Sequence, residues 1–144
     1  MRKHAQYTVL GKPFFPVGGQ AHNSTSYVLD DLRISFDAVR KLHGNSCAVT
    51  ICWDRLEPEE GNFDESYVTD IIDLARAEEM HLVLLWFGSW KNGIMSYCPA
   101  WVKQNPGRFQ RARSADGTPM LNLTCHCPAN VEADAKAFAR LCTI

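Results

Sequence analysis

Two apolar runs of strand length dominate the pattern of hydrophobic and polar positions along the chain. They cover residues 47–52 and 81–87, and each leads into tryptophan and polar side chains. Between them, apolar residues recur at helical spacing over 67–75, a pattern typical of a helix with one buried face. This order predicts a parallel βαβ unit. The second run is continuously apolar, which predicts a strand covered on both faces.

A further strand and helix are predicted before this unit. Residues 15–23 form a glycine-bearing strand candidate that ends in polar side chains, and apolar residues then recur at helical spacing over 29–39. The hydroxyls of residues 24–26 are predicted to cap the start of this helix, and Gly44 its end. Asp64 is predicted to cap the helix between the two apolar runs.

The remaining segments are less regular. Residues 7–15 predict a short hairpin or a lead-in strand around a turn. Residues 100–104 predict a turn or two of helix, and residues 111–123 a small hairpin. Asn130 is predicted to cap a last helix. The predicted order is therefore β-α-β-α-β, a long loop and a helix, which indicates an α/β fold. The predicted buried face of the last helix consists of Val131, Ala135, Phe138 and Cys142.

Chain length, net charge and the lengths of the apolar runs exclude some classes of function but identify none. The 144 residues suffice for one domain or part of one, and the formal net charge is −1. That balance favours neither nucleic acid nor an anionic membrane as a partner. No apolar run approaches the ~18 residues that cross a bilayer. The basic start, residues 1–7, is not followed by an apolar segment, so we predict no signal peptide.

The cysteines do not indicate a disulfide framework or a clear metal site. None of them forms a C-x-x-C pair. Cys125-His126-Cys127 has the ligands of half a zinc site, but no second pair lies at a suitable spacing, so we expect a structural role and no metal. The six cysteines are Cys47, Cys52, Cys98, Cys125, Cys127 and Cys142.

Several of these segments resemble a known enzyme family. Residues 53–64, which include Glu57-Pro58-Glu59-Glu60-Gly61-Asn62-Phe63-Asp64, are similar to the segment after the second barrel strand of (β/α)₈ glycoside hydrolases. The closer resemblance is to family 35 and the related family 42 β-galactosidases. Residues 18–24 resemble the first-strand motif of the bacterial branch of family 35, and residues 84–93 resemble its third strand.

Residues 99–103, the second hairpin and residues 130–134 continue the match, so the resemblance covers nearly the whole chain from about Phe14. Two departures concern the sugar subsite. Cys52 stands where the branch has a tyrosine, and residues 123–128 replace a Leu-Ser-Pro-type stretch.

The resemblance implies retaining hydrolysis of terminal β-galactosides by two glutamates about 5 Å apart, without a cofactor. In this family the acid/base follows the fourth strand and the nucleophile the seventh. We count about three of the eight βα units of a barrel, which needs ~200–250 residues. Residues 1–144 are therefore predicted to be the N-terminal part of a TIM-barrel catalytic domain. Both catalytic glutamates are expected beyond Ile144, and the chain alone is expected to be inactive.

The candidate substrate-binding residues follow the three predicted strands, where barrel active sites form. Tryptophan can stack on the C–H face of a pyranose, and asparagine can both donate to and accept from a hydroxyl. For each tryptophan the alternative is a plug at the top of the barrel. For Glu57 it is a loop carboxylate that holds backbone amides or an arginine. The candidates are His22, Asn23, Trp53, Glu57, Trp90, Lys91 and Asn92.

Two other functions remain open. A shortened barrel could be a carbohydrate-binding module that uses Trp53, Trp90, Lys91 and Asn92, and its open sheet edges would favour self-association. A compact three-stranded α/β domain with an unrelated role is the third hypothesis. The oligomeric state separates the first two, because a defined soluble oligomer favours the binding module.

Overall fold

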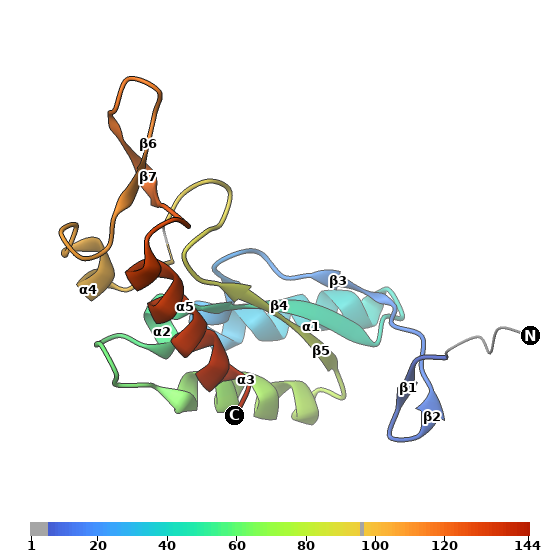
Figure 1. Ribbon diagram of the computed structural model, residues 1–144. Helices are drawn as coiled ribbons and strands as arrows, with labels where there is room; N and C mark the ends of the chain where they lie inside the picture. The colour runs from blue at the N-terminus through green and yellow to red at the C-terminus, as the bar shows by residue number, and fades with distance from the viewer. Residues whose placement is uncertain (1–5, 96) are drawn as a thin grey trace, which may run out of the picture.

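The structure is a computed structural model that describes residues 6–95 and 97–144. Figure 1 shows the arrangement of its elements. In chain order they are β1 (Thr8–Val9), β2 (Lys12–Pro13), β3 (Gly18–Gln20), the 3₁₀ helix η1 (Thr25–Tyr27), α1 (Leu29–Lys41), β4 (Ser46–Cys52), α2 (Trp53–Leu56), α3 (Glu65–Ala77), β5 (His81–Phe87), α4 (Ala100–Lys103), β6 (Arg111–Arg113), β7 (Pro119–Leu123) and α5 (Pro128–Leu141).

A three-stranded parallel sheet organises the molecule. Its order is β3-β4-β5, and β4 pairs with β5 in unbroken register from Ser46↔His81 to Cys52↔Phe87. The predicted βαβ unit and the α/β class are therefore confirmed. The first strand, β3, is shorter than predicted and pairs with β4 only from Gly18 to Gln20.

The core lies between one face of this sheet and the helices α1 and α3. Alternate β4 residues, Cys47, Val49 and Ile51, belong to one buried cluster with Phe36 of α1 and Ile71 of α3. Each fully buried Ile or Phe side chain contributes about 1.5–3 kcal/mol to folding. This cluster holds the two helices against one face of the sheet.

Strand β5 is one of the two edge strands of the sheet, and side chains on both of its faces are exposed, which corrects the prediction that it is covered on both faces. Among the described residues no strand pairs with its outer edge. Val83 and Leu84 point to opposite faces and are 51% and 37% exposed. The apolar run of β5 does form a strand, but the described residues cover only some of its side chains.

The predicted buried face of α5 is also wrong. Val131 and Phe138 are 50% and 47% exposed, while Ala137 and Leu141 are buried against the rest of the protein. The helix is apolar on two sides. Ala137 and Leu141 face the described core, whereas Val131 and Phe138 are exposed and line a pocket together with Trp86 of β5.

Of the predicted caps at the starts of α1, α3 and α5, only that of α3 is confirmed. Asp64 accepts a hydrogen bond from the Tyr67 amide and caps α3 as predicted. Val28, rather than residues 24–26, precedes the first turn of α1, and no side chain caps it. Cys127 precedes α5 with Pro128 in the first turn, so Asn130 lies inside that turn instead of capping it.

At the end of α1 the turn is closed by His43 and Gly44 together. His43 takes the left-handed conformation, with φ of 58°, and its amide donates to Arg40 O. The Gly44 amide donates to Val39 O at 2.9 Å, which completes a Schellman motif. Gly44 is required for space rather than for φ, since a Cβ there would lie 2.5 Å from Val39 Cγ1.

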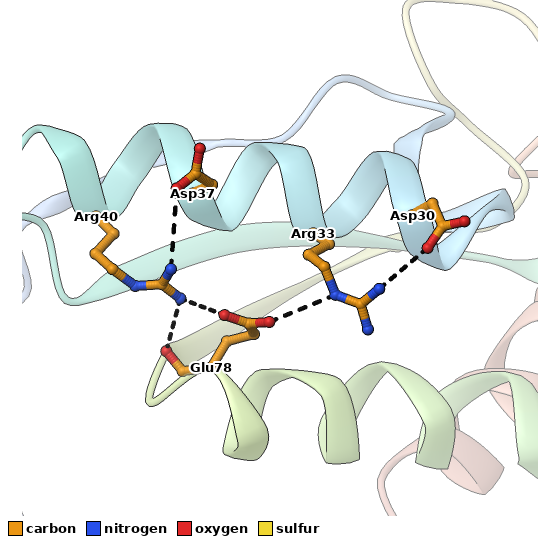
Figure 2. Close-up of polar contacts among 5 residues, drawn as sticks. All are labelled: Asp30, Arg33, Asp37, Arg40 and Glu78. Carbon is orange, nitrogen blue, oxygen red and sulfur yellow. Dashed lines mark hydrogen bonds and ion pairs between the residues drawn. The ribbon is translucent and has the colours of Figure 1, made fainter.

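Figure 2 shows a polar network that joins α1 to the end of α3. Arg33 and Arg40 both reach the carboxylate of Glu78, the C-cap residue of α3. Arg40 also donates to Glu78 O at 3.2 Å. A negative charge is unfavourable at a helix C-terminus, and the two guanidinium groups compensate for it. Exposed pairs of this kind contribute about 0–1 kcal/mol each.

The two hairpins and the short helix α4 are confirmed. The hairpin β1–β2 lies at one end of the sheet, and β6–β7 projects beyond the other end, where the parallel strands finish (Figure 1). Within the described ranges no helix is long and apolar enough to cross a membrane. The absence of a signal peptide stays a prediction, because residues 1–5 lie outside the described part of the chain.

The burial of the cysteines predicts how their thiols react. Cys125 and Cys142 are exposed, whereas Cys47, Cys52, Cys98 and Cys127 are buried. Burial raises the pKa of Cys98 to about 12 and also raises the pKa of Cys47 and Cys52, which disfavours the reactive thiolate.

We expect brief iodoacetamide treatment of the folded protein at pH 8 to modify two of the six thiols, those of Cys125 and Cys142. Peptide mass spectrometry identifies the labelled positions, and unfolding in urea should make all six react. Rapid labelling of Cys98 in the folded protein would contradict the structure.

Candidate functional site at the carboxyl edge of the sheet

The carboxyl ends of the three parallel strands bring the predicted site residues to one edge. His22 and Asn23 follow β3, Trp53 follows β4, and Trp90 follows β5. This is the edge at which active sites form in barrels built from parallel strands. The structure nevertheless divides the candidates, because some are presented to solvent and others are buried in the fold.

Trp53 and Glu57 are buried against each other. Trp53 is fully buried, and Glu57 is 2% exposed. The Trp53 indole N–H donates to Glu57 Oε2 at 2.8 Å, and the Gly61 amide donates to Oε1 at 2.8 Å. Both carboxylate oxygens therefore have donors. The position of these residues favours the structural alternatives, a plug and a carboxylate that holds a backbone amide, over contact with a sugar.

Two further aromatic rings, of Trp101 and Phe109, extend this arrangement around Trp53. The Trp101 ring lies edge-on to that of Trp53, with centroids 5.8 Å apart, and its N–H donates to Glu57 O at 3.2 Å. Phe109 packs edge-on against Trp101 at 5.4 Å. The loop after β4 is thus held by an aromatic cluster and the carboxylate within it.

A second carboxylate–indole contact lies at the end of β5. Asp134 of α5 accepts from the Trp86 indole at 2.7 Å and from the Ser89 amide at 2.8 Å. Gly88 lies between them, and a Cβ there would come within 2.3 Å of Asp134 Oδ1. The chain can leave β5 in this direction only because residue 88 has no side chain.

The segment that leaves β5 carries three of the predicted residues. Trp90 is 50% exposed, although its indole N–H donates to Leu123 O at 2.9 Å. Lys91 Nζ lies 4.4 Å from the centre of the Phe87 ring. Trp90 therefore combines a fixed position with an exposed surface, which a stacking residue requires.

Asn92 is a turn residue. It has φ of 55° and Gly93 has φ of 76°, and Lys91 and Ile94 pair backbone to backbone across them. This geometry is that of a two-residue hairpin turn, for which Asn-Gly is the favoured sequence. The dipeptide is a signal that sequence reasoning overlooked. The Asn92 side chain is exposed, so a contact with a ligand remains a prediction.

His22 and Asn23 begin the loop after β3. His22 is exposed and lines a pocket of about 270 Å³ along the free edge of that strand. The Asn23 carbonyl accepts from Thr50 Oγ1 at 2.8 Å. The loop is thereby tied to β4 while His22 remains accessible.

A buried hydroxyl network supports this loop from below. Ser26 Oγ lies 3.0 Å from Thr50 Oγ1 and 2.9 Å from Tyr67 Oη. The Cys52 amide donates to Tyr67 Oη at 3.4 Å. The network satisfies buried polar groups from three elements and explains why Ser26 is buried rather than capping α1.

Tyr27 and Asp54 form a polar pair at this edge that sequence reasoning missed. Tyr27 Oη donates to the Asp54 carboxylate, with oxygen distances of 2.9 and 3.1 Å. Burial raises the pKa of the Asp54 carboxyl, against lowering effects of Tyr27, Lys103 and Arg55. Burial also raises the pKa of Tyr27. An acidic residue two positions after a buried strand, as Asp54 is, was the available signal.

The carboxylates described at this edge are held within the fold. Glu57 holds Trp53, Asp134 holds Trp86, and Asp54 accepts from Tyr27. No group of three His, Cys, Asp or Glu side chains among the described residues could hold a metal ion. Cys127 donates instead to Arg108 O at 3.5 Å, which is a structural contact.

Replacing Glu57 by alanine tests the buried carboxylate. The change leaves the Trp53 indole and the Gly61 amide without a partner, and each buried unsatisfied donor costs about 1–3 kcal/mol. We expect the free energy of unfolding to fall by roughly 2–5 kcal/mol in urea denaturation. Glu59, which is exposed two residues away, is the matched control, and its alanine variant should differ from wild type by less than about 0.5 kcal/mol.

The raised pKa of Asp54 predicts a pH dependence of stability. The folded protein holds this proton more tightly than the unfolded chain. The free energy of unfolding attributable to Asp54 therefore falls as pH rises from 3.8, the ordinary value, through the raised pKa. Asp54→Asn keeps an acceptor for Tyr27 and removes the titration, so its stability relative to wild type should rise with pH over this interval.

Asp37→Asn is a control for which the change of stability with pH should have the opposite sign. A hydrogen bond from Lys41 lowers the pKa of Asp37, so its stabilising effect is present above 3.8 and is lost as pH falls through the lowered value. Urea denaturation at several pH values measures both variants. A relative stability of Asp54→Asn that falls with rising pH would contradict the geometry.

Comparisons with known proteins support the fold. No family model matches the chain, and no curated protein matches it. Among solved structures, the chain is similar to the exo-β-1,4-mannosidase Op5Man5 from Opitutaceae bacterium strain TAV5, with a TM-score of 0.61 and 17% identity over 91% of this chain and 22% of that one. It is also similar to the E323A catalytic mutant of Gan42B, a GH42 β-galactosidase from G. stearothermophilus, with a TM-score of 0.65 and 21% identity over 88% of this chain and 18% of that one.

The chain thus spans about a fifth of the length of each of these two structures. At these identities the likeness shows the fold, which is that of part of a TIM barrel of the kind found in glycosidases. The expected fold class is confirmed. Neither match is described as a family 35 enzyme, so that narrower resemblance remains a prediction.

Proposed function

We propose that this chain forms the first three βα units of a glycoside hydrolase barrel and contributes part of its sugar-binding edge. The observation that carries the proposal is the half-exposed Trp90, fixed at the carboxyl end of a parallel strand beside Lys91. A tryptophan face suits the C–H face of a pyranose, and an ammonium group suits its hydroxyls. The fold that the chain shares with two glycosidases supports this choice of ligand.

The proposed sugar contacts are His22, Trp90 and Lys91, with Asn23 and Asn92 beside them. Trp53 and Glu57 have a supporting role in this proposal, because both are buried and hydrogen-bonded to each other. They hold the loop after β4 in place. The proposed substrate class is a terminal β-galactoside, in line with the family 42 enzyme among the matches.

Catalysis is proposed to lie outside this chain. A retaining glycosidase needs two carboxyl groups about 5–5.5 Å apart on either side of the anomeric carbon. Glu57 and Asp134, two of the carboxylates described at this edge, each have both oxygens engaged by donors of the protein itself. The residues described here therefore suit binding of a sugar better than its hydrolysis.

The second candidate function is a carbohydrate-binding module without catalysis, and the open face beside β5 favours it. A pocket of about 510 Å³ lies between the end of β5 and α5, lined by Trp86, Trp90, Val131 and Phe138 among others. The unpaired edge of β5 adjoins it and would allow self-association. Sedimentation of the purified chain separates the two candidates, because a defined oligomer favours the module.

A sugar titration tests the binding proposal. We expect methyl β-galactoside to shift the backbone amide signals of residues 89–92 in ¹H–¹⁵N spectra at millimolar concentration. Trp90→Ala should weaken binding about tenfold or more, equivalent to about 1.4 kcal/mol, because the stacking surface is lost. Phe15→Ala is the matched control, since Phe15 is an exposed aromatic residue at the other end of the sheet.

Three outcomes would overturn parts of the proposal. Absence of binding to methyl β-galactoside and to methyl β-mannoside would overturn the sugar site. Equal loss of affinity in the Phe15 variant would show that the effect is unspecific. Turnover of p-nitrophenyl β-galactoside by the chain alone would overturn the placement of catalysis outside it.

A further inference from the structure

We propose that Asp134 is a positioning residue for the sugar site: it fixes the turn out of β5 and thereby sets the orientation of Trp90 and Lys91. This inference rests on the proposed function, since it concerns the same binding edge. Asp134 lies on α5, more than 40 residues along the chain from that turn, so only the tertiary structure brings the two together.

The two carboxylate oxygens of Asp134 each accept a hydrogen bond from a different donor of the turn. Asp134 Oδ1 lies 2.7 Å from Trp86 Nε1, and Oδ2 lies 2.8 Å from the Ser89 amide. Charge-assisted hydrogen bonds of this length are about twice as strong as neutral ones. The turn is therefore held on both sides of Gly88, directly before Trp90.

Two further contacts hold the same turn. The Cys98 thiol donates to Gly88 O at 3.6 Å, and the Trp90 indole donates to Leu123 O at 2.9 Å. A Cβ on Gly88 would lie 2.3 Å from Asp134 Oδ1 and 2.4 Å from Trp86 Nε1. The turn and the carboxylate thus fit together closely, and the direction of residues 89–91 depends on that fit.

This geometry gives Asp134 an indirect role. Each of its oxygens already accepts from a donor of the turn, Trp86 Nε1 or the Ser89 amide. Trp90 and Asp134 line the same pocket, where the carboxylate contacts the backbone next to the aromatic ring. We therefore expect its effect on affinity to pass through Ser89 and the residues that follow it.

Asp134→Asn is the decisive variant. It preserves size but turns one acceptor into a donor, which faces either the Trp86 indole or the Ser89 amide. We expect amide hydrogen exchange at Ser89 to accelerate at least tenfold and affinity for methyl β-galactoside to fall about fivefold. Trp86→Phe removes one donor and leaves the Ser89 contact, so its loss of affinity should be smaller.

Glu132→Gln is the matched control, because it neutralises an exposed carboxylate on the same helix. It should change neither exchange at Ser89 nor affinity. In the Trp90→Ala background, Asp134→Asn should weaken binding less than it does in the wild-type chain, since a large part of its effect acts through Trp90. Fully additive losses would overturn the positioning role, as would unchanged affinity after protection of Ser89 is lost.

The two proposals fail in different ways. If the wild-type chain binds neither methyl β-galactoside nor methyl β-mannoside, the sugar site fails and its positioning residue with it. Exchange at Ser89 still reports in that case whether Asp134 holds the turn. If the wild-type chain binds sugar and Asp134→Asn binds equally well, only the positioning role is overturned. Equal unfolding free energies of the variants, from urea denaturation, exclude a general loss of fold as the cause.

Discussion

The parallel pairing of β4 with β5 is the constraint on which the rest of the structure depends. Its unbroken register from Ser46↔His81 to Cys52↔Phe87 brings both strands to an end at the same edge. Parallel strands need a crossover between them, and here α3 supplies it and buries one face of the sheet. Trp53 and Trp90, which are 37 positions apart in the numbering, come to the same edge for this reason alone.

Two carboxylates hold the loops at that edge through tryptophan indoles. Glu57 accepts from Trp53 within one loop, and Asp134 accepts from Trp86 across two elements. Removing a carboxylate from water is costly unless its oxygens are hydrogen-bonded. In the buried Glu57 and in the half-buried Asp134, each oxygen has a donor. These hydrogen bonds favour a structural role for both acidic residues.

Large apolar side chains of β5 and α5 are left partly uncovered. Val83 and Leu84 of β5, and Val131 and Phe138 of α5, have a third or more of their surface exposed. Val131 and Phe138 line the pocket between α5 and the end of β5, whereas Val83 and Leu84 lie on opposite faces of the strand. An apolar patch of this kind, next to an unpaired strand edge, is typical of an interaction surface. It also explains why the sequence pattern of α5 indicates a buried face that this part of the chain does not cover.

Period and turn chemistry are local properties, so the strands, the helices α1, α3 and α5, the hairpins and the edge at which the polar side chains collect could be predicted from the sequence. Overlooked local signals, such as the Asn92-Gly93 turn, were present in it too. Which residues are exposed at that edge follows from tertiary contacts. Burial of Trp53 and Glu57, exposure of Trp90, and the link from Asp134 to the β5 turn depend on contacts between segments far apart in the chain. The two-sided apolar pattern of α5 shows the same limit, since periodicity identifies an apolar face but not the partner that covers it.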